Sequence, residues 1–191
     1  MEQIYQLNIP PIKELIISGF NGYNDEHLSY NYIVENSPEK ILKLDWLNFL
    51  NLSWEKVIYF KKQERKGSLH SDASYSAESI PPNNNLTVWG INWVYEGVRT
   101  MQYWNWENVV IDGLTPGSIN IPEHGVVTKL LPKTKPYKTY TLTEGCAYLV
   151  NATLPHLAIG NGRGTIFSLR PKNKNLEWPK VVNLFTKYII V

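Results

Sequence analysis

The amino-acid sequence predicts a mainly β protein, built as an antiparallel barrel or sandwich in one domain over residues 1–191. Two observations predict this fold class. Short segments rich in aromatic and β-branched residues recur along the chain, separated by turns that contain Gly, Pro or Lys. The chain has 191 residues, of which 13% are aromatic, which is enough for one sizeable core and argues against global disorder.

The first 54 residues are expected to form an N-terminal extension of the β core. Two short strands, a loop and a helix are expected there, at 2–8, 14–18, 21–38 and 41–50 respectively. The break between the two strands is Pro10-Pro11. The helix is predicted because apolar residues recur at three- and four-residue spacing.

The β core is expected over about residues 55–171. Its predicted strands lie at 55–61, 86–95, 100–106, 126–131, 137–142, 146–150, 154–159 and 165–169. The segment Glu96-Gly97-Val98-Arg99 carries a hairpin signal, and the Gly-rich segment 160–164 predicts a tight turn. The polar segment 73–85 reads as a long loop beside the strands, a candidate substrate-facing lid. In the C-terminal segment, 172–191, an amphipathic helix is expected over 177–191, with a terminal strand at 188–191 as the alternative.

Charge and cysteine content narrow the classes of function. The formal net charge is +2, from 19 basic and 17 acidic residues, whereas a dedicated nucleic-acid binder would have a strongly basic face. The single cysteine, Cys146, excludes an internal disulfide. Because no signal peptide or membrane-length apolar run is visible, we expect a cytoplasmic protein without membrane partners.

The chemistry-bearing residues are the couple His70 and Asp72 and the distant His156. Residues two apart on an extended segment project to the same side, so an imidazole and a carboxylate can share one metal ion. If the fold returns His156 to this couple, two His and one carboxylate hold the metal and leave three positions open. A core histidine with a satisfied hydrogen bond is the alternative for His156.

The segments 144–151 and 154–156, together with Arg163 and Ser168-Leu169-Arg170, resemble the end of the Fe(II)/2-oxoglutarate-dependent oxygenase fold. In that family a Gly-led strand precedes the distal His, and the next strand carries a basic residue that pairs with 2-oxoglutarate. The upstream His70-Ser71-Asp72 resembles the proximal pair of the family. The resemblance implies a double-stranded β-helix (jelly-roll barrel) with a few flanking helices.

The resemblance also implies a cosubstrate site on the strand over 165–169 and its continuation. There Ser168 and Arg170 share one face, and a polar Ser-x-Arg that faces into a barrel is costly unless an anion meets it. A dicarboxylate such as 2-oxoglutarate would be a suitable anion, because a guanidinium binds a carboxylate with two hydrogen bonds. Strand phase favours Arg170 over its competitor Arg163, which is expected in the turn. If strands 154–159 and 165–169 pair, Ser168 lies about opposite His156.

The expected function is therefore hydroxylation with Fe(II), 2-oxoglutarate and O2, yielding succinate and CO2. Asn92, Trp93 and Tyr103 lie on strands that can line the pocket, with ordinary core packing as the alternative for each. The substrate is expected to be a peptide or amino-acid side chain, or a small polar molecule. Two other classes stay open: a cupin-like metal-binding barrel without 2-oxoglutarate, and a non-catalytic β-sandwich that serves as a binding or virion module.

Overall fold

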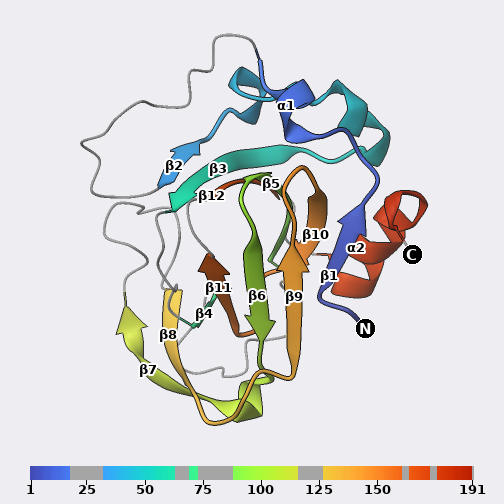
Figure 1. The fold of residues 1–191 in the computed structure, drawn as a ribbon. Helices are drawn as coiled ribbons and strands as arrows, with labels where there is room; N and C mark the ends of the chain where they lie inside the picture. The colour runs from blue at the N-terminus through green and yellow to red at the C-terminus, as the bar shows by residue number, and fades with distance from the viewer. Residues whose placement is uncertain are drawn as a thin grey trace.

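The computed structural model describes residues 1–17, 32–62, 69–72, 88–115, 127–160, 164–172 and 176–190. Within these residues two six-stranded antiparallel sheets face each other (Figure 1). The first, sheet A, has the spatial order β1 (Ile4–Leu7), β10 (Ala147–Asn151), β5 (Trp89–Glu96), β12 (Gly164–Pro171), β3 (Trp54–Lys62) and β2 (Tyr32–Glu35). The second, sheet B, has the order β7 (Val109–Thr115), β8 (Val127–Pro132), β4 (His70–Ser71), β11 (His156–Gly160), β6 (Arg99–Tyr103) and β9 (Lys138–Leu142).

From β3 to β6, and again from β9 to β12, the chain crosses from one sheet to the other between successive strands. Along the sequence, β3, β5, β10 and β12 belong to sheet A, whereas β4, β6, β9 and β11 belong to sheet B. This alternation is the double-stranded β-helix, so the predicted fold class is confirmed. The pair β7 and β8 extends sheet B beyond β4. The sequence predicted β8, as the strand 126–131, but did not predict β7.

Two predicted hairpins are wrong, because their strands lie in opposite sheets. β5 and β6 are joined at Gly97, whose φ of 78° reverses the chain, but β5 pairs with β10 and β12 while β6 pairs with β9 and β11. β11 and β12 are likewise not paired with each other, so Ser168 is not the strand partner of His156. A turn between sheets needs the same Gly-containing local sequence as a turn within a sheet.

The N-terminal extension differs from the predictions in its local backbone. In place of a strand at 14–18, the chain forms the one-turn helix α1 (Ile12–Leu15), which begins after Pro11 and buries both of its end residues. In place of the helix expected at 41–50, the structure has the 3₁₀ helix η2 (Asp45–Leu50), and another 3₁₀ helix, η1 (Pro38–Lys40), precedes that segment. The three-residue spacing of Leu47 and Leu50, both buried, suits a 3₁₀ helix with three residues per turn.

The apolar core has a layer on each face of sheet A. On the outer face, Trp93, Leu149 and Phe167 pack against α1, η2 and the C-terminal helix α2 (Trp178–Phe185). On the inner face, Val94 and Tyr148 of sheet A pack against Met101 and Leu142 of sheet B. Side chains alternate between the two layers along each strand, because successive residues point to opposite faces.

The C-terminal segment is mainly helical, as expected. Pro179 stands in the first turn of α2, where its missing N–H costs nothing, and Val181 and Phe185 lie one turn apart and are fully buried. The 3₁₀ helix η4 (Thr186–Tyr188) follows, and the alternative terminal strand is reduced to a single bridge between Leu7 and Ile189. Among the described residues, none of the helices is both long and apolar enough to cross a membrane.

Candidate metal centre

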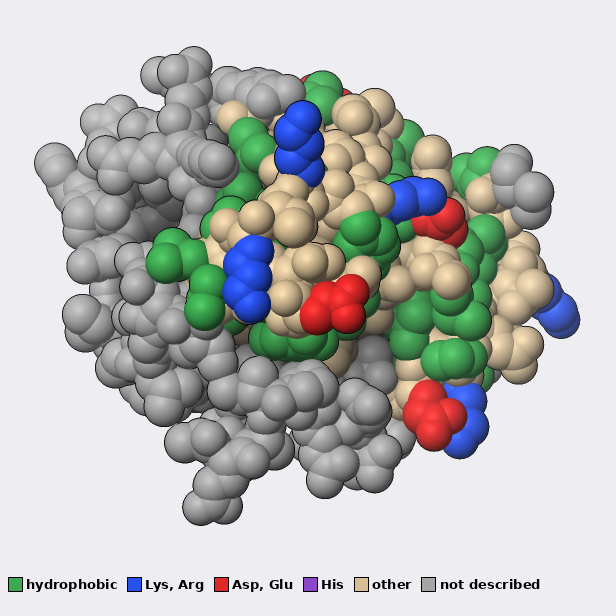
Figure 2. Space-filling model, turned by 90° about the horizontal axis from the view of Figure 1, so that it is seen from below, with side chains coloured by type: hydrophobic (Ala, Val, Ile, Leu, Met, Phe, Trp, Pro, Cys, Tyr) green, Lys and Arg blue, Asp and Glu red, His purple; other side chains and the backbone are tan. Residues whose placement is uncertain are grey.

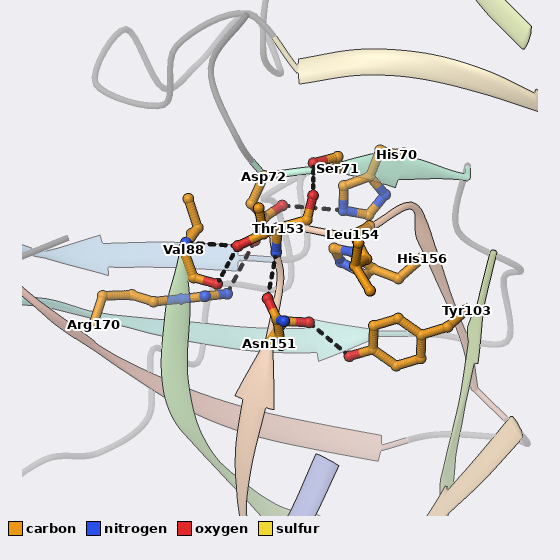
Figure 3. Close-up of polar contacts among 10 residues, drawn as sticks. All are labelled: His70, Ser71, Asp72, Val88, Tyr103, Asn151, Thr153, Leu154, His156 and Arg170. Atoms are coloured by element: carbon orange, nitrogen blue, oxygen red, sulfur yellow. Dashed lines mark hydrogen bonds and ion pairs between the residues drawn. The ribbon is translucent and has the colours of Figure 1, made fainter. Parts of the chain in front are cut away.

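The strand pairing of sheet B brings two distant histidines together. β4 and β11 are antiparallel neighbours, and His70 lies directly opposite His156 in their register. Their imidazole rings are 4.5 Å apart between centroids (Figure 3). Directly opposed residues project to the same face of a sheet, so both rings point to the same side. No histidine is visible among the described residues on the face of the molecule drawn in Figure 2.

Asp72 completes the group. It follows β4, and its N–H donates to the carbonyl oxygen of Ala152 at 3.0 Å, which turns the chain toward the start of β11. Its Oδ1 lies 3.3 Å from Nε2 of His70, as the two-residue spacing predicted. The ligand atoms of His70, Asp72 and His156 all lie within 4.8 Å of one another, so modest side-chain rotations suffice to place them around one ion.

Hydrogen bonding leaves one nitrogen of His156 available for a metal. Its Nδ1 lies 2.9 Å from the carbonyl oxygen of Leu154, and because a carbonyl only accepts, Nδ1 must carry the proton. Nε2 therefore keeps its lone pair. Metal-binding histidines commonly donate their second nitrogen to a carbonyl in this way, which fixes the ring orientation.

The protonation states also suit a cation. Burial, and then the neighbouring His70 ring, lower the pKa of His156 to about 4, so the imidazole is neutral near pH 7. Burial would raise the pKa of Asp72, but the hydrogen bond from His70 and the charge of Arg170 outweigh it and hold that pKa well below its usual range. A neutral imidazole and an ionised carboxylate are the forms that ligate metals.

The turn between β10 and β11 holds these residues in place. The Ser71 hydroxyl donates to the carbonyl oxygen of Thr153 at 2.6 Å, and the Val88 N–H donates to Oγ1 of Thr153 at 2.8 Å (Figure 3). The Thr153 N–H in turn donates to Oδ1 of Asn151 at 3.0 Å. Thr153 thus fixes both chain segments that border residues 73–87, one of which carries Asp72.

Arg170 reaches the carboxylate of Asp72 from the opposite sheet. Its Nη2 lies 3.2 Å from Oδ2 of Asp72, and its side chain is 12% exposed. The stem of Arg170 crosses Gly90 of β5, where a Cβ would lie 2.9 Å from Cδ of Arg170 and 2.8 Å from the carbonyl oxygen of Leu169. Only glycine leaves room for this path, and a glycine inside a strand is the sequence signal for such a close approach.

Further polar groups line the inner face of sheet A near Arg170. Lys56 of β3 lies directly opposite Arg170, is 3% exposed, and has its Nζ 3.5 Å from Oε1 of Glu55. Ser168 is fully buried, lies two residues before Arg170 on β12, and is opposite Asn92 of β5. The sequence analysis did not single out Lys56, which lies two residues before Ile58 on β3 and therefore shares its inner face.

The remaining predicted residues divide into three groups. The ring of Tyr103 lies 5.8 Å from that of His156, and its hydroxyl donates to the carbonyl oxygen of Asn151 at 2.8 Å. Trp93 belongs to the outer core layer and donates to the carbonyl oxygen of Pro10 at 3.1 Å, so it packs in the core and does not line this site. Arg163 and the expected lid over 73–85 lie outside the described residues.

Comparisons with known proteins do not place the chain in a family. No family model matches it. No curated protein matches it in sequence.

Three solved structures that resemble the chain are distant from it in sequence. The E. coli protein ycfD is 9% identical with a TM-score of 0.38, and the match covers 69% of this chain and 28% of that one. Hydroquinone 1,2-dioxygenase PnpCD, solved with Cd2+ and 4-hydroxybenzonitrile, is 16% identical with a TM-score of 0.36, covering 74% and 68%. Peruvianin-I, a cysteine peptidase from Thevetia peruviana latex, is 14% identical with a TM-score of 0.34, covering 87% and 74%. At such scores these likenesses decide nothing about function, which we therefore argue from the site.

The chain carries a candidate metal centre. It consists of His70, Asp72 and His156, at the start of β11, on an antiparallel jelly-roll scaffold. Arg170 contacts its carboxylate, and a buried polar group, Asn92 and Ser168, lies next to Arg170 on sheet A.

Proposed function

We propose that this protein is an Fe(II)- and 2-oxoglutarate-dependent dioxygenase that hydroxylates its substrate. The observation that carries the proposal is the convergence of His70, Asp72 and His156, with the tautomer of His156 already set for ligation. Two histidines and one carboxylate on one face of an octahedron leave three positions open, a set of ligands typical of non-haem Fe(II) oxygenases.

The charges around the site support a dicarboxylate as cosubstrate. The two positive charges near the site are balanced by two carboxylates: Glu55 is paired with Lys56, and Asp72 with Arg170. A divalent metal ion then leaves two uncompensated positive charges in a largely buried region, where uncompensated charge is costly. A dianion such as 2-oxoglutarate supplies the missing negative charge.

Each residue of the site has a role in this proposal. The iron would be held by His70, Asp72 and His156. A carboxylate of 2-oxoglutarate would be bound by the Ser168 hydroxyl and by Nη1 of Arg170, since Asp72 is paired with the Nη2 atom. Arg163 stays the alternative for the role of Arg170. Apolar side chains between the sheets, Val94 and Met101 among them, would keep water from the reacting atoms. Bound Fe(II) with 2-oxoglutarate and O2 supplies an oxidant strong enough to hydroxylate a C–H bond, with release of succinate and CO2.

The proposed substrate is a peptide or amino-acid side chain, or a small polar molecule. We propose no nucleic-acid or membrane partner, since the net charge of +2 gives no basis for binding a polyanion.

The proposal is tested by anaerobic titration of the purified protein with Fe(II) and then 2-oxoglutarate. We expect a weak visible charge-transfer band for the wild type and none for His156→Ala. Asn183→Ala, an exposed position on α2, is the control that should keep the band. Aerobic release of succinate from 2-oxoglutarate provides a second measurement, and circular dichroism checks that each variant is folded.

The other outcomes point to the two rival classes. A protein that binds a first-row metal but gives no band with 2-oxoglutarate is a cupin-like metal-binding barrel, and the dioxygenase proposal is then wrong. A protein that binds no metal is a non-catalytic β-sandwich, such as a binding or virion module.

A further inference from the structure

The inner face of sheet A carries two buried polar side chains next to the candidate metal centre. Asn92 on β5 is 8% exposed, and Ser168 on β12 is fully buried. They are direct cross-strand partners, so their side chains project side by side into the space between the sheets. Val94, the next inner-face residue of β5, and Tyr148, opposite Asn92 on β10, belong to the hydrophobic cluster between the sheets.

These side chains and Arg170 hold buried polar atoms without a hydrogen-bond partner. The atoms are Oδ1 of Asn92, Oγ of Ser168 and Nη1 of Arg170. Leaving such a group unpaired costs about 1–3 kcal/mol, and native proteins rarely leave several together. Three in adjacent positions on one face indicate that a ligand supplies the partners.

The spacing indicates the shape of that ligand. Arg170 contacts Asp72, and Ser168 lies two residues back along β12, about 6.6–6.8 Å further between the sheets. A ligand that reaches from the metal to Ser168 must therefore extend inward past Arg170 and end in a group that accepts hydrogen bonds. The end of a short dicarboxylate has this chemistry.

We infer that Asn92 acts with Ser168 to bind the distal carboxylate of the cosubstrate and to select its length. This inference rests on the proposed function. A half-turn of the Asn92 amide exchanges its oxygen and nitrogen, so Nδ2 can donate where Oδ1 now lies. With the Ser168 hydroxyl and Nη1 of Arg170, three donors then surround one carboxylate, a number that its two oxygens can accept.

The experiment measures the affinities of four 2-oxo acids for the Mn(II)-loaded protein by calorimetry. They are pyruvate, with one carboxylate, and the dicarboxylates oxaloacetate, 2-oxoglutarate and 2-oxoadipate, which differ by one carbon each. We expect the wild type to bind 2-oxoglutarate most tightly. Asn92→Leu should weaken 2-oxoglutarate about 10-fold, the loss expected for one hydrogen bond to a charged group, and leave pyruvate unchanged. Asn92→Asp should weaken 2-oxoglutarate more, because like charges repel.

Three controls separate an effect on the distal carboxylate from effects on folding or metal binding. Asn183→Asp makes the same chemical change at an exposed position of α2 and should change no affinity. Ser168→Ala removes a single oxygen from the same pair, so it serves if Asn92→Leu fails to fold, and it should also weaken 2-oxoglutarate alone. Mn(II) affinity, measured without any 2-oxo acid, should stay equal in all variants.

The inference and the proposed function fail in different ways. If wild type and Asn92→Leu bind 2-oxoglutarate equally, or if Asn92→Leu weakens pyruvate to the same extent, Asn92 does not bind the distal carboxylate, and the dioxygenase proposal is untouched. If the wild type binds no metal or no 2-oxo acid, the proposed function is wrong and the inference falls with it.

Discussion

The buried imidazole of His156 should make the metal-free protein lose stability in mild acid. Its pKa falls from 6.5 in an unfolded chain to about 4 in the folded protein, because the ring is only 4% exposed and lies beside His70. Between these two values the unfolded chain binds the proton and the folded protein does not. The stability that the neutral His156 ring contributes is therefore fully present above about pH 6.5 and is lost as the pH falls toward 4.

The magnitude follows from the two pKa values. A tenfold difference in proton affinity is worth about 1.4 kcal/mol, so the full decline contributed by His156 is about 3 kcal/mol. The carboxylate of Asp72 acts in a different window, because its folded pKa lies below the ordinary value of 3.8 and its contribution is lost only as the pH falls below that value.

The assay is urea unfolding at several pH values from 7.5 to 4.5, with a chelator present, for the wild type and His156→Gln. We expect the free energy of unfolding to fall more steeply for the wild type below pH 6.5, and the two curves to run parallel above it. Parallel curves over the whole range would refute the reasoning, since the imidazole would then titrate alike in both states.

Three further substitutions test the path of Arg170, the outer core layer and the hydrogen bond of Tyr103. Gly90→Ala places a methyl group within 2.9 Å of the Arg170 stem, so we expect a cost of about 1–3 kcal/mol in urea unfolding and weaker 2-oxoglutarate binding; an unchanged affinity would contradict this. Phe185→Ala empties a fully buried position of the outer core layer and should cost about 3–5 kcal/mol by the same assay. Tyr103→Phe removes the hydrogen bond to Asn151 and should lower stability by about 1–3 kcal/mol in thermal unfolding, whereas a neutral effect would mean that water replaces the hydroxyl.

Most of the strands and the meeting of His70 with Asp72 could be predicted from the sequence, because both depend on local spacing. Alternation along β12 indicated that Ser168 and Arg170 share a face, and the structure places both on the inner side of sheet A. The two-residue spacing of His70 and Asp72 indicated that their side chains meet, and their ligand atoms lie 3.3 Å apart. The periodicity of side chains along a strand is a property of the backbone and does not depend on the fold.

Tertiary structure alone decided which strands pair, and so what surrounds each site residue. The sequences around Gly97 and at 160–164 suit a hairpin, yet the strands that flank each of them lie in opposite sheets. Arg170 therefore reaches Asp72 from across the sandwich, over a glycine that leaves room for its stem. A turn sequence fixes how the chain reverses, but the partner of each strand depends on which apolar faces are buried together, and that is determined by contacts between residues far apart in the chain.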